Sequence, residues 1–224
     1  MTNPVALVRL LQLSSPTLPV GAYSYSQGLE AAVEARIVVD ELSARDWIRD
    51  VLALSLQAME APVFLRLAAA WREQDPARAV LWNEEFLASR ETAELRAETL
   101  QMGYSLRELL RSLDVAHVDA LDVLDELAYP TAFAFAAAAW NIEPGDALSG
   151  YLFAWIENQV LAAVKAVPLG QAAGQRMLFT LAASVPPVVE AAAAMSDADL
   201  HNFAPGLALL SSLHETQYSR LFRS

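Results

Sequence analysis

The chain lacks cysteine altogether, which excludes disulfide bonds and thiolate metal sites. Its three histidines, His117, His201 and His214, lie far apart, so no pair has the short spacing of a metal site. Lys165 is the single lysine, and its surroundings do not match the glycine-rich P-loop that ends in Lys-Ser or Lys-Thr. The sequence therefore predicts no metal site, no bound nucleotide cofactor and no catalytic residue.

Positive charge is also scarce, with 15 basic against 27 acidic residues and a formal net charge of −12. An acidic surface repels nucleic acid and anionic lipid headgroups. No basic segment precedes an apolar core at the N-terminus, so a secretory signal is not expected. The apolar run 129–140 is too short to span a bilayer, and the run 178–195 contains Pro186, Pro187 and Glu190. We expect a soluble, cytoplasmic protein without nucleic acid or membrane partners.

Only eight glycines are present, whereas alanine is abundant and 55% of the residues are hydrophobic. This mixture favours helix over strand, and no long stretch alternates apolar and polar residues as a half-buried strand would. A chain of 224 residues is long enough for one sizeable core. The sequence predicts an all-α fold, a single compact helical bundle of about ten helices over residues 1–224.

Prolines and capping residues divide the chain into these helices. Ser43 and Asp46 resemble a capping box, and Asp75 followed by Pro76 is typical of a helix start. Pro62 is expected to end a helix, to kink it, or to open the next one. We expect helices over residues 4–13, 26–35, 90–113, 146–167, 171–184, 188–195 and 205–222, with others beginning near residues 43, 76 and 129. The helix from Tyr129 is apolar on all sides, which predicts the buried centre of the bundle.

Three segments stand out, and the first is LLQLSSPTLPVGAYSYSQGLE, which includes Tyr23. It is either an ordinary loop packed by its prolines or a loop that faces a partner. Tyrosines on a rigid frame of proline and glycine bind at low entropic cost. The residues alone favour neither interpretation.

The second segment is YLFAWIENQVLAAVKAVPLGQAAGQR, which a proline and a glycine divide into two helices. Gln159 continues a core stripe, so its amide must find a partner or line a polar channel. Gln171 and Gln175 form a pair four residues apart on the second helix. Gly170 and Gly174 have the same spacing and would permit close helix packing. A kinked core helix pair with satisfied amides is the structural alternative.

The third segment is HETQYSRLFRS at the end of the chain. Tyr218, Leu221 and Phe222 share one stripe if the segment is helical, and Arg220 and Arg223 lie off that stripe. The segment is either a final helix whose arginines complement its dipole or a tail that docks on another chain. We expect a docking tail, removal of which leaves stability nearly unchanged.

These three segments, with SRETAELRAETLQMGYSL between the first two, resemble the signature stretches of the urease accessory protein F (UreF) family. They occur in the expected order and extend over nearly the whole chain. The resemblance implies an all-α homodimer that is not an enzyme. It also implies a nickel metallochaperone scaffold that joins accessory protein D (also called H) and the GTPase accessory protein G on apo-urease. Together these proteins deliver nickel to a carbamylated lysine of urease.

The resemblance further implies that the tail and Tyr23 contact protein D, and that the surface around Lys165 faces the GTPase. The predicted partner-binding residues are Tyr23, Lys165, Gln171, Gln175, Arg176, Tyr218, Arg220 and Arg223. Gln159 is the channel candidate, since amides and carboxylates can pass an ion that this chain is poorly equipped to chelate.

Two alternatives stay open. One is a GTPase-activating role, in which Arg176 or Arg220 reaches the phosphates bound by the partner. The other is a small helical enzyme that uses acidic residues with Gln159 or Lys165.

Overall fold

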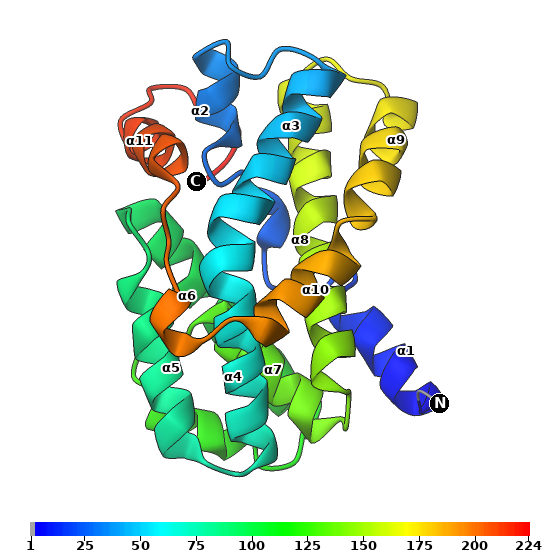
Figure 1. The fold of residues 1–224 in the computed structure, drawn as a ribbon, viewed down its shortest axis with the longest axis vertical. Helices are drawn as coiled ribbons and strands as arrows, with labels where there is room; N and C mark the ends of the chain where they lie inside the picture. The colour runs from blue at the N-terminus through cyan, green and yellow to red at the C-terminus, as the bar shows by residue number, and fades with distance from the viewer. Residues whose placement is uncertain (1–2) are drawn as a thin grey trace.

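The computed structural model describes residues 3–224 and, within them, contains eleven α-helices and no strand (Figure 1). The all-α prediction, with about ten helices in a single domain, is confirmed. The α-helices are α1 (Pro4–Leu13), α2 (Leu29–Glu34), α3 (Glu41–Val51), α4 (Ala61–Arg72), α5 (Pro76–Ala88), α6 (Ala93–Ser112), α7 (Tyr129–Ala139), α8 (Pro144–Ala166), α9 (Gln171–Ala182), α10 (Val185–Ala194) and α11 (Pro205–His214). A π-helical segment, Leu52–Glu60, joins α3 to α4, and short 3-10 turns cover Ala22–Ser24, Val118–Val123 and Asp197–Asp199.

The centre of the bundle is α7, which packs against α4, α6 and α8, as its apolar surface predicts. Phe133 of α7 is fully buried and meets Phe64 edge-on, with ring centroids 5.8 Å apart. The ring of Tyr151 on α8 lies 5.3 Å from that of Phe133. Edge-to-face contacts of this kind add to the stabilisation from apolar burial. These aromatic contacts form the centre of the hydrophobic core.

Two N-terminal caps begin their helices, and one differs from the prediction. Asp75 caps α5 and Pro76 occupies its first turn, as predicted. The predicted box of Ser43 and Asp46 is wrong, because Asp40 is the cap of α3. The Ser43 main-chain N–H donates to Asp40 Oδ1 at 2.9 Å, and Asp40 N–H donates to Ser43 Oγ at 3.1 Å. The reciprocal box exists, but it begins three residues earlier than the sequence suggested.

Prolines mostly open helices in this fold rather than break them. Pro62 lies in the first turn of α4, directly after the π-helical segment. Pro144 starts α8, two residues before the predicted start at residue 146. Pro186 and Pro187 lie in the first turn of α10. A proline is tolerated there because its missing N–H would have no intrahelical partner.

Consecutive helices that join end to end form two stretches longer than the apolar runs considered in the sequence. Residues 41–72 and 171–194 are each long and apolar enough to cross a membrane by length and composition. In the first, 72% of the most apolar window is buried inside the protein, as expected of a core helix. The second is 28% buried, so it lies mainly on the surface, and the prolines of α10 interrupt it.

Helices α8 and α9 pack closely at Gly174. A Cβ there would lie 2.9 Å from a methyl group of Val164, so only glycine permits this approach. Nothing lies within 4 Å of the corresponding position at Gly170. The prediction of a close helix approach therefore holds for one glycine of the pair.

Candidate functional site

The loop before α2 presents one tyrosine to solvent and buries another. Gly21 and Gly28 have φ of 81° and 78°, in the left-handed region that glycine adopts at little cost. Gln27 has φ of 51°, which is uncommon for a residue with a side chain. With these turns, the Tyr23 side chain is 62% exposed, whereas Tyr25 is buried.

Lys165, near the end of α8, connects this loop with the end of the chain. Its Nζ lies 5.8 Å from the ring centroid of Tyr23 and 5.7 Å from that of Phe222. About two helical turns earlier on α8, Asn158 Nδ2 donates to the Tyr25 carbonyl at 3.1 Å. The three segments singled out in the sequence thus meet around the single lysine of the chain.

Residues 215–224, which we call the strap, are not helical, and the predicted stripe is wrong. Phe222 is buried, but Tyr218 is fully exposed and Leu221 is 71% exposed. The strap folds back so that its end lies beside α2 (Figure 1), where Ser26 N–H donates to the Ser224 main-chain oxygen at 2.7 Å. Because Phe222 and Ser224 are buried, the expectation that removing this segment leaves stability nearly unchanged does not fit the structure.

Two carboxylates beneath the strap explain why it is not a helix: Glu30, which is buried, and Glu94, which is partly buried. Glu30 accepts from the main-chain N–H groups of Leu221 at 2.7 Å and Phe222 at 2.9 Å, in place of carbonyls one turn earlier. His214 is fully buried at the root of the strap, with Nε2 3.2 Å from Glu30 and Nδ1 2.7 Å from Glu94. Glu94 also accepts from Arg220 at 2.7 Å. Both ring nitrogens of His214 therefore lie within hydrogen-bond distance of a carboxylate.

A third carboxylate, Glu98, holds the end of the strap. Its two oxygens accept from Gln27 Nε2 at 2.7 Å and from Ser224 Oγ at 2.9 Å. Trp155 Nε1 donates to the Gln27 amide oxygen at 2.7 Å, which ties this network to α8. Burial raises the pKa of Glu98 to about 7.

Sequence reasoning missed these carboxylates and His214. The available signal was that Glu94 and Glu98 lie four residues apart on the same side of α6 as the core residues Leu95 and Met102. That pattern alone does not separate a buried glutamate from a solvated one.

Beside Glu98 lies a small internal cavity of about 60 Å³, large enough for about two water molecules. Its polar lining includes Glu60, which accepts from the Tyr151 hydroxyl and pairs with Arg90 Nη1 at 3.3 Å. Burial raises the pKa of Tyr129 and Tyr151, so both hydroxyls stay neutral. The channel candidate Gln159 is not on this lining.

Gln159 is buried with 2% exposure, and its Nε2 has no hydrogen-bond partner among residues 3–224. The expectation that its amide finds a partner is therefore not met at this nitrogen. Its role in a channel stays a prediction.

The predicted residues of α9 lie on the exposed surface of that helix. Gln171 and Gln175 are exposed, and Arg176 forms a two-pronged pair with Glu41 of α3 at 3.0 and 2.5 Å. No hydrogen bond or ion pair found in residues 3–224 joins them to Lys165. The sequence grouped these residues with the lysine; in the structure they lie on the next helix, which packs against α8.

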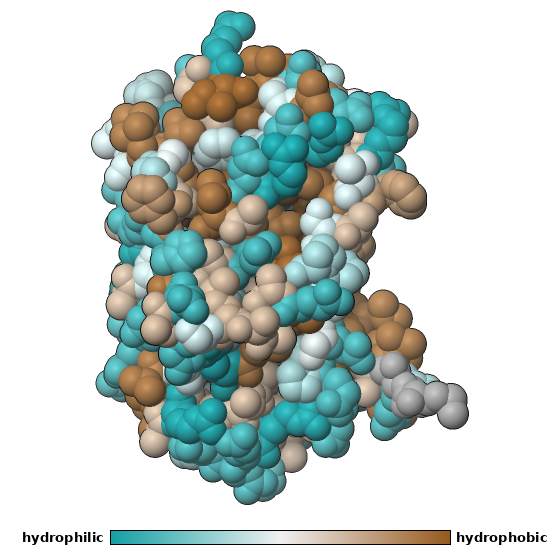
Figure 2. All heavy atoms as spheres, in the orientation of Figure 1, coloured by the Kyte–Doolittle hydropathy of each residue, from teal (hydrophilic) through white to brown (hydrophobic). Residues whose placement is uncertain are grey.

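An apolar face covers parts of α1, α8, α9 and α10, and Figure 2 shows hydrophobic side chains gathered on the protruding α1. Exposed apolar side chains of α1 are Val5, Leu7, Val8 and Leu11. Phe153 of α8 extends this face, together with Ala182 of α9 and Val185 of α10. A hollow of about 430 Å³ lies between the helices. Gly150 permits α1 to pack here, since a Cβ would lie 2.5 Å from Leu10 Cδ1.

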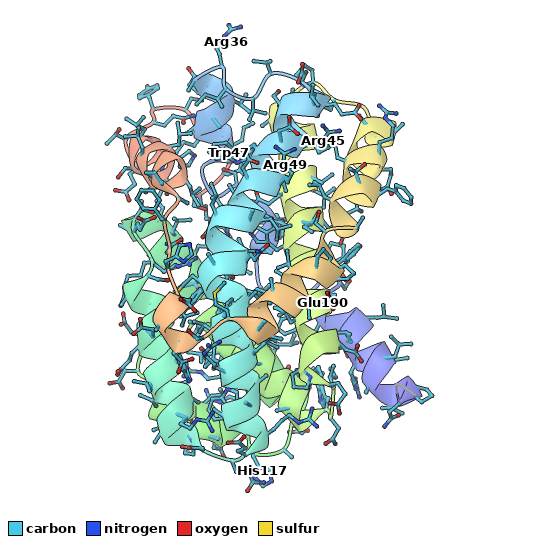
Figure 3. All side chains as sticks on the ribbon, viewed as in Figure 1. Arg36, Arg45, Trp47, Arg49, His117 and Glu190 are labelled. Carbon is cyan, nitrogen blue, oxygen red and sulfur yellow. The ribbon has the colours of Figure 1, made fainter. Side chains whose placement is uncertain are left out.

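Within residues 3–224, no group of three or more histidine or acidic side chains has the arrangement needed to hold a metal ion. Figure 3 shows His117 at the far end of the molecule from α2 and the strap. The exposed arginines of α3 in the same view are paired locally: Arg49 contacts Asp46 at 2.9 Å and Asp50 at 3.0 Å.

The chain matches a family model described as UreF over residues 38–182. It is 59% identical over 232 residues to the urease accessory protein UreF of Azoarcus sp. (strain BH72), covering 100% of this chain and 99% of that protein. Identity to the urease accessory protein UreF of Ralstonia pickettii (strain 12J) is 54%, with both chains covered completely (100%). The corresponding protein of Janthinobacterium sp. (strain Marseille) is 52% identical, with 98% of each chain covered.

Proposed function

Because the chain belongs to the UreF family of urease accessory proteins, we propose that it is a scaffold for nickel insertion. In this role it brings accessory protein D (also called H) and the GTPase accessory protein G to apo-urease in the cytoplasm. The observation that carries the proposal is the meeting of loop, α8 and strap around Lys165. A binding protein needs such a composite surface, and UreF is an accessory family rather than an enzyme family.

The strap and the loop are the proposed contact for protein D. Between them lies an open hollow of about 460 Å³, lined by Arg223, Gln101, Ser105 and loop residues 16–25. Tyr23 lines this hollow, and Tyr218 of the strap is fully exposed. Tyrosine and arginine side chains are favoured anchors in interfaces. A partner segment that carries carboxylates and apolar side chains would fit this hollow.

Lys165 and the exposed residues of α9 are the proposed contact for the GTPase. Lys165 is exposed beside two aromatic rings, so its charge is available to a partner while its position is restrained. Gln171, Gln175 and Arg176 present amide and guanidinium groups without burial. The assignment of this surface to the GTPase depends on the resemblance to UreF.

The apolar face of α1, α8, α9 and α10 is the proposed homodimer interface. Single exposed apolar residues are normal, but several on adjacent helices indicate a contact surface. Val8→Asp should convert a dimer into a monomer in light scattering, because it places a charge in the apolar contact. Leu42→Asp, at another exposed apolar residue, is the matched control and should remain dimeric. A Val8→Asp variant that stays dimeric would place the interface elsewhere.

The alternatives have less support from the geometry. Arg176 and Arg220 are each held by a carboxylate, Glu41 and Glu94 respectively, so neither is free to reach a partner's phosphates without first breaking an ion pair. For an enzyme, Gln159 is buried whereas Lys165 lies on the surface. GTP hydrolysis by the partner that rises with this chain and falls in Arg176→Ala or Arg220→Ala would favour the GTPase-activating role.

The test of the scaffold is capture of its partners from cells that express apo-urease with proteins D and G. The tagged chain should retain all of them, and Lys165→Ala should lose the GTPase and lower urease activation while keeping its helical circular dichroism. Arg72→Ala, an exposed cation paired with Glu143, is the matched control and should behave as wild type. Full capture and activation by Lys165→Ala would contradict the placement of the GTPase, and failure of the wild-type chain to capture any partner would contradict the scaffold itself.

A further inference from the structure

The last residue of the strap sits in a buried polar site rather than on the surface. Ser224 is 0% exposed, and its hydroxyl donates to Glu98. The hydroxyl of Ser26 donates to the Ser224 main-chain oxygen at 2.6 Å, and Arg223 N–H donates to the Ser24 carbonyl at 2.8 Å. The strap therefore covers Glu98 and closes it off from solvent on this side.

Among residues 3–224, no basic side chain forms an ion pair with Glu98. The groups around it are Glu60 from the π-helical segment, Arg90 from the connection before α6, Tyr25 and Gln27 from the loop, Trp155 and Asn158 from α8, and Arg223 from the strap. Arg90 is paired with Glu60, and burial raises the pKa of Tyr25, so its hydroxyl is neutral. Desolvation outweighs the bonds from Gln27 and Ser224 and raises the pKa of Glu98 to about 7.

We propose that the strap is a latch that opens as pH rises through neutrality, with Glu98 as its titrating group. When Glu98 is neutral, its hydroxyl donates to Ser224 and its carbonyl oxygen accepts from Gln27, so Glu98 adds no unpaired charge beneath the closed strap. When Glu98 ionises, the closed strap holds an unpaired charge away from water, and opening returns that charge to solvent.

The direction follows from proton linkage. The closed strap binds the Glu98 proton more tightly than the open strap, so proton release favours opening. The root of the strap is held separately, by the contacts of His214 with Glu30 and Glu94. The proposal concerns the chain by itself and does not depend on any partner.

The absence of native cysteine allows a single spin label to report on the strap. Leu221→Cys places a nitroxide on an exposed strap residue, and electron paramagnetic resonance then measures its mobility from pH 6 to 9. The label should be immobilised at pH 6. The ratio of mobile to immobile strap should rise with pH above neutrality by up to about tenfold per unit, the limit for one proton.

Variants separate Glu98 from other groups. Adding Glu98→Gln should keep the strap immobilised over the whole range, because the amide keeps both hydrogen bonds and cannot ionise. Glu84→Gln, at an exposed glutamate of α5, should titrate as wild type. A transition that is unchanged in Glu98→Gln would assign the pH response to another group and overturn the proposal.

Two outcomes remain decisive if Glu98→Gln does not fold. A flat mobility profile for the strap label in the otherwise wild-type chain would overturn the proposal. A label at Phe179→Cys, exposed on α9, should show no transition. If this control changes in parallel with the strap, the whole fold loosens and the strap is not an independent latch.

Discussion

The aromatic core around Phe133 and the strap site around Glu98 are both buried, but different forces stabilise them. In the core, Phe64 and Phe133 have no exposed surface and contact other rings. In the strap site, buried carboxylates accept hydrogen bonds from main-chain and side-chain donors of the strap. Apolar burial responds little to pH, whereas carboxylate bonds depend on protonation. The sequence-predicted residues Tyr23, Lys165 and Arg223 lie at the second region, where the balance of forces is more easily changed.

The largest loss of stability is expected in the aromatic core. Phe133→Ala should lower the free energy of unfolding by about 3–5 kcal/mol, because it leaves a cavity among rings that cannot collapse. Urea denaturation followed by circular dichroism measures this change. The control Phe179→Ala, at a ring that is 84% exposed, should change stability by no more than about 0.5 kcal/mol. A small effect at Phe133 would mean that the core is not the main source of stability.

The next effect tests the pH response of the strap side. The pKa of Glu98, about 7 in the folded protein, exceeds its ordinary value of 4.5. The folded state therefore keeps a proton that the unfolded state releases. The stability from this group is complete below about pH 4.5 and is lost as pH rises to 7, by on the order of 3 kcal/mol. Wild type should lose stability relative to Glu98→Gln between pH 5 and 8 in urea denaturation.

Other carboxylates do not affect the difference in stability between wild type and Glu98→Gln. Ion pairs with arginines lower the pKa of Glu41, Glu126 and Glu143, so their contribution is lost as pH falls. They are present in both proteins and cancel in the difference. If the stabilities of wild type and Glu98→Gln change in parallel with pH, Glu98 does not make the strap site more sensitive to pH than the core.

A smaller effect separates the strap from the rest of the fold. Glu30→Gln should cost about 1.5–3 kcal/mol, because it weakens charged hydrogen bonds to two strap N–H groups and to His214. Trypsin should then cleave after Arg220 faster than in wild type. Glu34→Gln, exposed on the same helix, is the matched control and should show neither change. Equal cleavage in both variants would show that Glu30 does not hold the strap.

The smallest effect concerns the exposed pair of Arg176 and Glu41. Arg176→Ala should change the free energy of unfolding by less than about 0.5 kcal/mol, since the Arg176 side chain is 63% exposed and its pair is screened by water. A loss of GTPase capture by this stable variant would then report a direct contact. A large loss of stability would show that the pair is structural and would weaken its place in the proposed interface.

Most of the fold could be predicted from local sequence patterns. The predictions that were wrong concern helix starts and the end of the chain. The apolar surface of α7 and the cap at Asp75 were predictable, because periodicity and capping act within a few residues. The helix starts predicted at residues 146 and 188 were too late, because Pro144 and Pro186 lie in the first turns of α8 and α10. The sequence does not show whether a proline follows a helix or begins one. The end of the chain was predicted to be helical, but Glu30 takes N–H groups that a helix would use.

The sequence by itself determined the all-α class, the membership in the UreF family and the three segments that meet at Lys165. Four stretches in a fixed order carry that information, and no distant contact is needed to read it. Only the tertiary structure decided that Glu30 and Glu98 are buried, that Glu94 is partly buried, and that the strap lies on them. Glu30 and the Leu221 N–H that it accepts are 191 residues apart, so the bond depends on how the bundle closes. Long-range closure decides whether a glutamate faces water or binds the end of its own chain.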